Sequence, residues 1–212
     1  MSSMRSIIYG AGSFGHELAE FICDSLNINL DKKECIFFVD DWKSAKSENI
    51  AWELCGSLDE FTFQESDKVY IGFGDPLKRH EAFISLKKRR IMPSSFIHPT
   101  AYISKDCQIM DGSIISPFCT VGFKSKLNYN VLLNTYVAVG HHVEIGESSV
   151  ISPKTLLAGK VEIGERCFLG SGSIITPSKK VGDNSSVGAG SVVYRNVKEG
   201  TKVFGNPAKK GF

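Results

Sequence analysis

The chain has 212 residues, enough for one large or two small domains, and 25 Lys and Arg against 23 Asp and Glu leave a net charge of +2. This balance excludes the bulk electrostatic field that draws a protein to nucleic acid or to an anionic membrane. No apolar stretch is long enough to cross a bilayer, and residues 1–9 lack the pattern of a signal peptide. We therefore expect a cytoplasmic protein without a nucleic-acid partner.

The first 95 residues have the order of a small βαβ unit. Residues 6–9 predict a strand, residues 10–15 match the pattern GxGxxG, and a helical pattern follows at 18–22. Further strands are predicted at 35–39, before Asp40 and Asp41, and at 69–72, before Asp75 and a helix that starts near Pro76. We predict a Rossmann-like nucleotide-binding domain over residues 1–95.

The glycine-rich segment predicts a phosphate site, because glycines let a phosphate approach the backbone N–H groups of a helix N-terminus. A tight turn without a ligand is the alternative, since this motif alone is a weak signal. A two-lobed dinucleotide fold needs about twice this length, so a single nucleotide is the better fit. We expect Asp40 and Asp41 to face the crevice at the edge of the sheet, with a solvated turn as their alternative.

From Ile97 onward a bulky aliphatic residue recurs at every sixth position. The series has 17 members without a miss or an insertion: Ile97, Ile103, Ile109, Ile115, Val121, Leu127, Leu133, Val139, Ile145, Ile151, Leu157, Ile163, Leu169, Ile175, Val181, Val187 and Val193. Glycine follows seven of these residues. Three positions further on, every repeat except the one with Lys179 has a small residue or valine.

A period of six fits neither an α-helix nor a heptad, and the strands of a sandwich alternate with period two and vary in length. It fits a solenoid with flat sides of six residues, whose aliphatic side chains fill a narrow core and whose coils stack by parallel pairing. We predict such a parallel β-helix over residues 96–212.

The six cysteines form no CxxC pair and have no Cys/His spacing that suits zinc. We expect free thiols in a reducing compartment and no metal site. Cys107, Cys119 and Cys167 lie at the small-residue position of the repeat. A structural role at a corner of the coil explains these three better than catalysis.

Together the two parts resemble the hexapeptide-repeat sugar acyltransferases of the PglD/NeuD type. These include the UDP-4-amino-sugar N-acetyltransferase of the bacillosamine pathway and the sialic acid O-acetyltransferases. The resemblance covers nearly the whole chain, and its most specific pieces are residues 34–41, residues 133–135 followed by His141, and the ending at 205–210. It implies a left-handed β-helix, acetyl-CoA as co-substrate and a homotrimer with active sites between neighbouring subunits.

The resemblance also implies roles for single residues. His141 matches the catalytic base. From its place beside His141 we expect His142 to be a helper that orients the base by a hydrogen bond, and we expect Asn134 to be a polar contact to the sugar amine. A nucleotide sugar, with UDP as the expected nucleotide, would be bound in the N-terminal domain by Ala11, Gly12, Ser13, Asp40, Asp41 and Asp75. The pantetheine arm and phosphates of acetyl-CoA would be bound by Gly159, Gly170, Ser171, Gly188, Ala189 and Lys209. The alternative is that none of these residues binds a ligand. They would then be residues of solvated turns, corner residues that the repeat itself requires, and free charges of the tail.

Three positions depart from the pattern of the family. The glycine loop is one residue longer, His142 stands where the family has an acidic residue, and Val150 stands where it has a further histidine. Three functions remain open on the sequence. They are an N-acetyltransferase for a nucleotide-linked 4-amino-4,6-dideoxy sugar, a sugar O-acetyltransferase, and a binding protein that has lost catalysis. The missing carboxylate beside His141 favours an amine acceptor, because a hydroxyl needs a stronger base.

Overall fold

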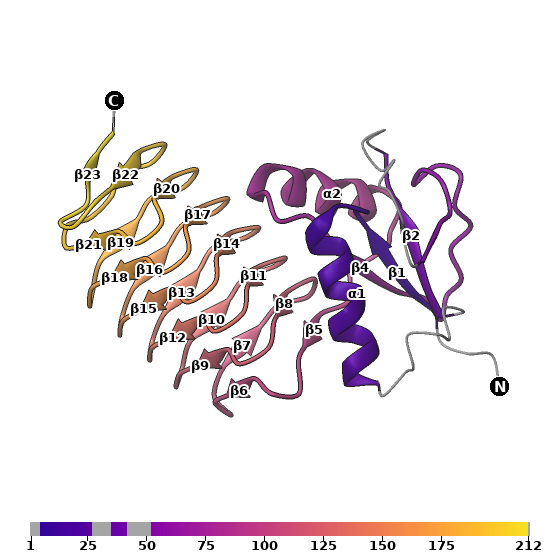
Figure 1. The fold of residues 1–212 in the computed structure, drawn as a ribbon, viewed down its shortest axis with the longest axis horizontal. Helices are drawn as coiled ribbons and strands as arrows, with labels where there is room; N and C mark the ends of the chain where they lie inside the picture. The colour runs from indigo at the N-terminus through magenta and orange to yellow at the C-terminus, as the bar shows by residue number, and fades with distance from the viewer. Residues whose placement is uncertain (1–4, 27–34, 42–51, 212) are drawn as a thin grey trace.

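The computed structural model describes residues 5–26, 35–41 and 52–211, arranged as a small α/β domain followed by a long β-helix (Figure 1). Residues 1–4 and Glu34, which the sequence argument used, lie outside the described residues. In the described part of the chain, no helix is both long and apolar enough to span a bilayer.

The N-terminal domain is a four-stranded parallel sheet in the order β3-β2-β1-β4 with two helices. Its elements are β1 (Ser6–Tyr9), α1 (Ser13–Ser25), β2 (Ile36–Val39), β3 (Glu53–Leu54), β4 (Lys68–Ile71) and α2 (Pro76–Lys88). The three strands and two helices expected from the sequence are confirmed. Strand β3 was missed because it has only two residues, both exposed, and therefore no hydrophobic pattern.

The two helices cover opposite faces of this sheet, because successive strand side chains point to opposite sides. Ile8 of β1 packs in one cluster with Leu18 of α1. Its neighbour Ile7 packs in another cluster with Phe83 of α2. Helix α1 therefore has the sheet on one side, and its other side is available for the β-helix.

From β5 to β21 the β-helix consists of two-residue strands that stack in parallel with a register of 18 residues, as in the pairing of Lys126 with Glu144. At its end, β22 pairs with β20 at a spacing of 16 residues and β23 returns antiparallel to β22. Three sheets result. The first contains β5 (Phe96–Ile97), β8 (Ile114–Ile115), β11 (Leu132–Leu133), β14 (Val150–Ile151), β17 (Phe168–Leu169), β20 (Ser186–Val187), β22 (Lys202–Phe204) and β23 (Lys209–Lys210). The second contains β6 (Tyr102–Ile103), β9 (Thr120–Val121), β12 (Ala138–Val139), β15 (Leu156–Leu157), β18 (Ile174–Ile175) and β21 (Val192–Val193). The third contains β7 (Gln108–Ile109), β10 (Lys126–Leu127), β13 (Glu144–Ile145), β16 (Glu162–Ile163) and β19 (Lys180–Val181).

From β5 to β21, the second residue of each strand is the aliphatic residue of the repeat, and from Ile115 onward it is buried in one continuous core. The prediction is wrong for Ile97, which is 43% exposed, and holds only in part for Ile103 and Ile109, which are partly buried. These three belong to the first coil, which has no coil beneath it. At the other end the core continues past Val193 through Val197 and Val203, which the series of six did not include because the spacing changes there.

Small polar side chains join consecutive coils at the corners. Ser125 donates to the carbonyl of Gly140 at 2.8 Å. The thiol of Cys119 makes the same contact with the carbonyl of Asn134, and that of Cys167 with the carbonyl of Gly182, at 3.0 and 3.1 Å. Burial raises the pKa of the Cys119 thiol to about 11, so this group stays protonated and unreactive. The predicted corner role of the cysteines is confirmed.

The outward residues give the three sheets different surfaces. The interdomain face, on the sheet that starts with β5, presents Phe96, Ile114, Leu132 and Val150, which are buried in one cluster with α1. The apolar face presents Tyr102, Thr120, Ala138, Leu156, Ile174 and Val192. The charged face presents Gln108, Lys126, Glu144, Glu162 and Lys180.

The β-helix begins at Phe96, next to the domain boundary expected at residue 95. The two parts nevertheless share the hydrophobic cluster between α1 and the interdomain face. Their division into a binding domain and a transferase domain stays a prediction.

Candidate active site

His141 and His142 lie together at the corner between the apolar face and the charged face, and both are exposed. Their Nδ1 atoms are 3.0 Å apart, and the two rings are nearly perpendicular, at 87°. His142 has φ 56° and donates its backbone N–H to the carbonyl of Phe123 at 2.8 Å. The stacking of coils therefore holds both backbones in place while the two imidazoles project outward.

The contact between the Nδ1 atoms requires one ring to donate and the other to accept. If Nδ1–H of His141 donates, its Nε2 has a free lone pair and can accept a proton. His142 then does by hydrogen bonding what an acidic residue would do with a charge, because it holds its neighbour in one tautomer.

The His141 ring lies over Gly159, the residue stacked on it in the next coil. A Cβ at position 159 would be 2.6 Å from both Cε1 and Nε2 of His141. Gly159, expected from the resemblance to line the donor path, thus makes room for the imidazole of His141. Its contact with a pantetheine arm stays a prediction.

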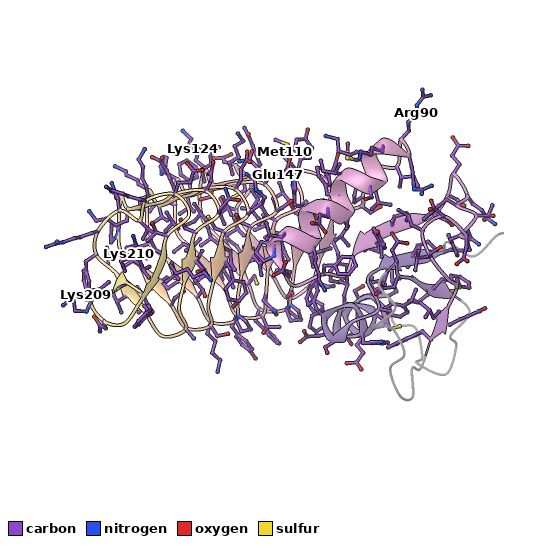
Figure 2. The ribbon with its side chains drawn as sticks, turned by 90° about the horizontal axis from the view of Figure 1, so that it is seen from above. Arg90, Met110, Lys124, Glu147, Lys209 and Lys210 are labelled. Atoms are coloured by element: carbon purple, nitrogen blue, oxygen red, sulfur yellow. The ribbon has the colours of Figure 1, made fainter. Side chains whose placement is uncertain are left out.

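A groove of about 730 Å³ opens beside His142. It is lined by Asp106, Gln108, Lys124, Ser125, Lys126, His142, Val143 and Glu144. The Lys124 ammonium lies over the ring of Phe123, 5.2 Å from its centroid, and Figure 2 shows Lys124 on the outer edge of the β-helix. Sequence reasoning missed this groove because its polar residues come from different coils and share no motif.

The other residues expected to bind the donor lie at a different corner. Gly170, Ser171, Gly188 and Ala189 are in the turns between the interdomain face and the apolar face, across the apolar face from His141. Asn134 is at this second corner too, where its Oδ1 accepts the N–H of Thr135 at 2.7 Å. A single chain therefore does not bring these residues together with His141.

Lys209 lies at the end of the β-helix that is far from the N-terminal domain, beside Lys210 (Figure 2). The antiparallel return of β23 on β22 brings it close to residues after β21. Two cavities of about 460 and 480 Å³ are lined there by Arg195, Ala208 and Lys209, and Lys198 and Lys210 also line the cavity of about 460 Å³. The sequence indicated Lys209, but the gathering of cations depends on the return of the chain.

In the N-terminal domain, the expected phosphate loop is the start of α1. Gly12 is its N-cap residue, it provides no side-chain cap, and a Cβ there would meet nothing within 4 Å. Gly12 and Ser13 are exposed, whereas the buried Ala11 donates its N–H to Oδ2 of Asp40 at 2.7 Å. The Gly15 position tolerates no side chain, because a Cβ would be 2.0 Å from the carbonyl oxygen of Gly10.

The three acidic residues expected to meet the nucleotide sugar all have internal partners. Asp40 accepts from Ala11 as described, and Asp41 accepts from the Tyr9 hydroxyl at 2.5 Å and from the Leu58 N–H at 2.6 Å. Asp75 caps α2 by accepting from the N–H groups of Leu77 and Lys78, each at 3.0 Å. These contacts explain the acidic residues structurally, and their ligand roles stay predictions.

Val150, which stands where the family has a histidine, is buried on the interdomain face. It is on a different sheet from the corner of His141. Its departure from the pattern therefore removes no partner of His141 within this chain.

Replacing Gly159 with Ala should displace the His141 ring, because the new Cβ overlaps it. Gly172→Ala is the control: this position has φ +69° and open space around it, and other coils have Tyr136 and Lys154 at the equivalent position. In imidazole NMR spectra we expect the His141 signals to shift in Gly159→Ala and to stay in Gly172→Ala. Unchanged His141 signals in Gly159→Ala would contradict the packing.

Comparisons with known proteins agree with this architecture. The pattern of the family described as "Hexapeptide repeat of succinyl-transferase" matches residues 160–195, and no curated protein matches the chain significantly. The acetyltransferase domain of PglB from Neisseria gonorrhoeae FA1090 is 26% identical with a TM-score of 0.88, over 99% of this chain and 100% of that chain. That domain has also been solved in complex with acetyl coenzyme A.

WeeI from Acinetobacter baumannii AYE is 25% identical with a TM-score of 0.88, over 99% of this chain and 100% of that chain. PerB from Caulobacter crescentus, solved in complex with CoA and GDP-perosamine, is 24% identical with a TM-score of 0.82, over 98% of this chain and 97% of that chain, and shares the fold. These matches confirm the predicted fold, a Rossmann-like α/β domain followed by a left-handed parallel β-helix, and they support the resemblance to PglD-type hexapeptide-repeat acetyltransferases.

Proposed function

We propose that this protein is an acetyl-CoA-dependent N-acetyltransferase that acetylates the amino group of a nucleotide-linked sugar. The observation that carries the proposal is the exposed His141, which lies over Gly159 and contacts His142, a residue that lines an open groove. It occurs in a chain that matches, over 99% of its length, an acetyltransferase domain solved with acetyl coenzyme A.

The chemistry follows from this arrangement. The sugar amine attacks the thioester carbonyl of acetyl-CoA, so a C–N bond forms and the C–S bond breaks. Nε2 of His141 takes the proton that the amine loses and returns it to the departing thiolate of CoA. Nδ1–H of His141 donates to His142 throughout, and a backbone N–H at a glycine corner stabilises the oxyanion of the tetrahedral intermediate.

A 4-amino-4,6-dideoxy sugar linked to UDP, as in the bacillosamine pathway, is the proposed acceptor. The start of α1 supports binding of its phosphates, because the helix has no side-chain cap there and Gly12 faces open space. PerB was solved with a GDP sugar, so the nucleotide must be tested directly. An amine is preferred over a hydroxyl acceptor because His142 supplies no negative charge to strengthen the base.

The proposed assembly is a homotrimer with shared active sites. The apolar face has an exposed column that includes Tyr102 and Leu156, which are 67% and 41% exposed. By contrast, the charged face is covered by ion pairs such as Lys126–Glu144 at 3.2 Å, as expected of a surface in water. A neighbour packed on the apolar face would bring its second corner, with Asn134 and Ser171, toward His141.

The same packing gives acetyl-CoA a path. Its pantetheine arm would run between the His141 corner of one subunit and the Gly170, Ser171, Gly188 and Ala189 corner of the next. Small residues leave backbone groups open to the amides of the arm. The cations around Lys209 at the end of the β-helix would bind the CoA phosphates.

Thermal-shift screening with UDP, GDP, dTDP and CMP sugars, each with and without acetyl-CoA, should identify the acceptor. A ligand at 100 times its dissociation constant stabilises the folded state by about 2.7 kcal/mol. Gly12→Asp is the matched variant, because an Asp at the N-cap stabilises a helix but repels a phosphate. We expect it to lose the nucleotide shift and keep the acetyl-CoA shift, and an unchanged nucleotide shift would place the site elsewhere.

Removal of the base should lower turnover without affecting donor binding. General-base catalysis contributes about 10²–10⁴-fold, so we expect a loss of that size in His141→Ala and a smaller loss in His142→Phe. His142→Glu, which restores the acidic residue of the family, should keep turnover. Steady-state kinetics with calorimetry of CoA binding tests this, and a His141→Ala enzyme within a factor of a few of wild type would end the assignment.

Leu156→Asp should dissociate the trimer, because it buries a charge in the proposed subunit interface. Gln108→Asp places the same charge on the charged face and should leave the assembly intact. Sedimentation velocity at micromolar concentration distinguishes the two variants. A wild-type monomer under these conditions would rule out the shared site.

A further inference from the structure

Arg79 of α2 is completely buried, and among the described residues its guanidinium donates hydrogen bonds only to backbone carbonyls. Nε donates to the carbonyl of Asn130 at 2.7 Å, and Nη2 donates to that of Gly112 at 2.9 Å. Nη1 donates to the carbonyls of Ile71 and Phe73 at 2.8 and 3.4 Å. In return, Nδ2 of Asn130 donates to the carbonyl of Arg79 at 2.9 Å.

Such a cation is costly to bury, because no carboxylate among these contacts neutralises it. Burial lowers the pKa of Arg79 to about 9, which still leaves the group charged at neutral pH. The fan of donors in a guanidinium can bind several carbonyls at once, whereas the ammonium of a lysine cannot reach the same set. The geometry therefore indicates that this cation serves to join the segments whose backbone carbonyls it contacts.

The four carbonyls come from the two parts of the protein. Ile71 ends β4 and Phe73 follows it, whereas Gly112 and Asn130 occupy the same corner in two successive coils of the β-helix. The Phe73 ring lies against Gly10, since a Cβ there would be 3.0 Å from it. Arg79 thus connects the β-helix, through Phe73, to the glycine-rich segment at the start of α1.

Neighbouring residues of α2 dock on the same corner. Nδ1 of His80 is 3.1 Å from a carboxylate oxygen of Glu147, and the rings of Phe83 and Tyr129 stack with centroids 6.0 Å apart. Figure 2 shows Glu147 near the end of α2 that lies by the β-helix, and Arg90 beyond the opposite end. Arg79 and Phe83 are both completely buried, whereas the side chain of His80 is partly exposed.

We propose that Arg79 is a positioning residue that holds the nucleotide-binding edge of the N-terminal domain in register with the β-helix, so that the acceptor amine reaches His141. This inference rests on the proposed function. The nucleotide is bound by one part of the protein and the acetyl group is transferred at the other. The interface that contains Arg79 fixes how these two parts are placed within each chain.

The test compares Arg79→Met and Arg79→Lys with Arg166→Met as a matched control. Arg166 lies at the same corner of a later coil, where its side chain contacts Asn184 and Glu165 within the β-helix. Each enzyme is assayed with a nucleotide-linked amino sugar and with the free amino sugar, whose binding does not involve the nucleotide. Dissociation constants for the nucleoside diphosphate and for acetyl-CoA are measured separately.

We expect turnover of Arg79→Met with the nucleotide sugar to fall by about 10²-fold, because small misplacements of a reacting group cost that much. Arg79→Lys should fall less. The rate with the free amino sugar and both dissociation constants should stay within about twofold, and Arg166→Met should resemble wild type. Equal losses with both acceptors would show a general structural role and overturn the proposal.

If Arg79→Met does not fold, Asn130→Gly replaces it. Glycine suits φ 59° and keeps the carbonyl that Nε contacts, whereas the side-chain amide that donates to the Arg79 carbonyl and to Oγ of Ser148 is lost. If wild type transfers acetyl to no amino sugar, the proposed function fails, and crystal structures then decide the positioning role. A displaced N-terminal domain in the Arg79 or Asn130 variant supports it, and unchanged placement overturns it.

Discussion

The structure depends on the stacking of 18-residue coils, in which the strand residues lie directly over their equivalents in the next coil as far as β21. A narrow aliphatic core and hydrogen-bonded small residues at the corners enforce this register, since a slip of one residue would turn the core side chains outward. The chemistry at any point is consequently a property of a column of residues. His141 can project from its corner because its column has glycine at position 159, where any side chain would overlap the imidazole.

The outward columns divide the tasks of the β-helix among its faces. One face is packed against α1 from Phe96 to Val150, one is charged and forms ion pairs at the surface, and one is apolar and exposed within the single chain. The corner of His141 lies between the last two, and the small residues expected to bind the donor lie at the other end of the exposed apolar face. Because the two corners are separated within one chain, a site shared between subunits is the simplest arrangement that brings them together.

The N-terminal domain shows how structural and functional demands compete for the same residues. Asp40, Asp41 and Asp75 have the positions expected of ligand contacts, and all three stabilise backbone N–H groups of their own domain. The start of α1 is different, because no side chain caps it and the space beside Gly12 is open. The Arg79 guanidinium joins this domain to a corner of the β-helix by hydrogen bonds to backbone carbonyls of both parts. The proposed nucleotide site and the corner of His141 therefore have a fixed placement within one chain.

The sequence by itself determined the β-helix, because a strict period of six is compatible with few other folds, and it determined the βαβ order through glycine and strand patterns. It also indicated His141, His142 and Gly159, but not that the glycine makes room for the imidazole, since these residues are 18 positions apart and meet only through stacking. The short strand β3, the ends of the core at Ile97 and Val203, the groove beside His142 and the carbonyl contacts of Arg79 were decided by tertiary structure. Each of them depends on contacts between distant segments, which a local pattern of side chains does not encode.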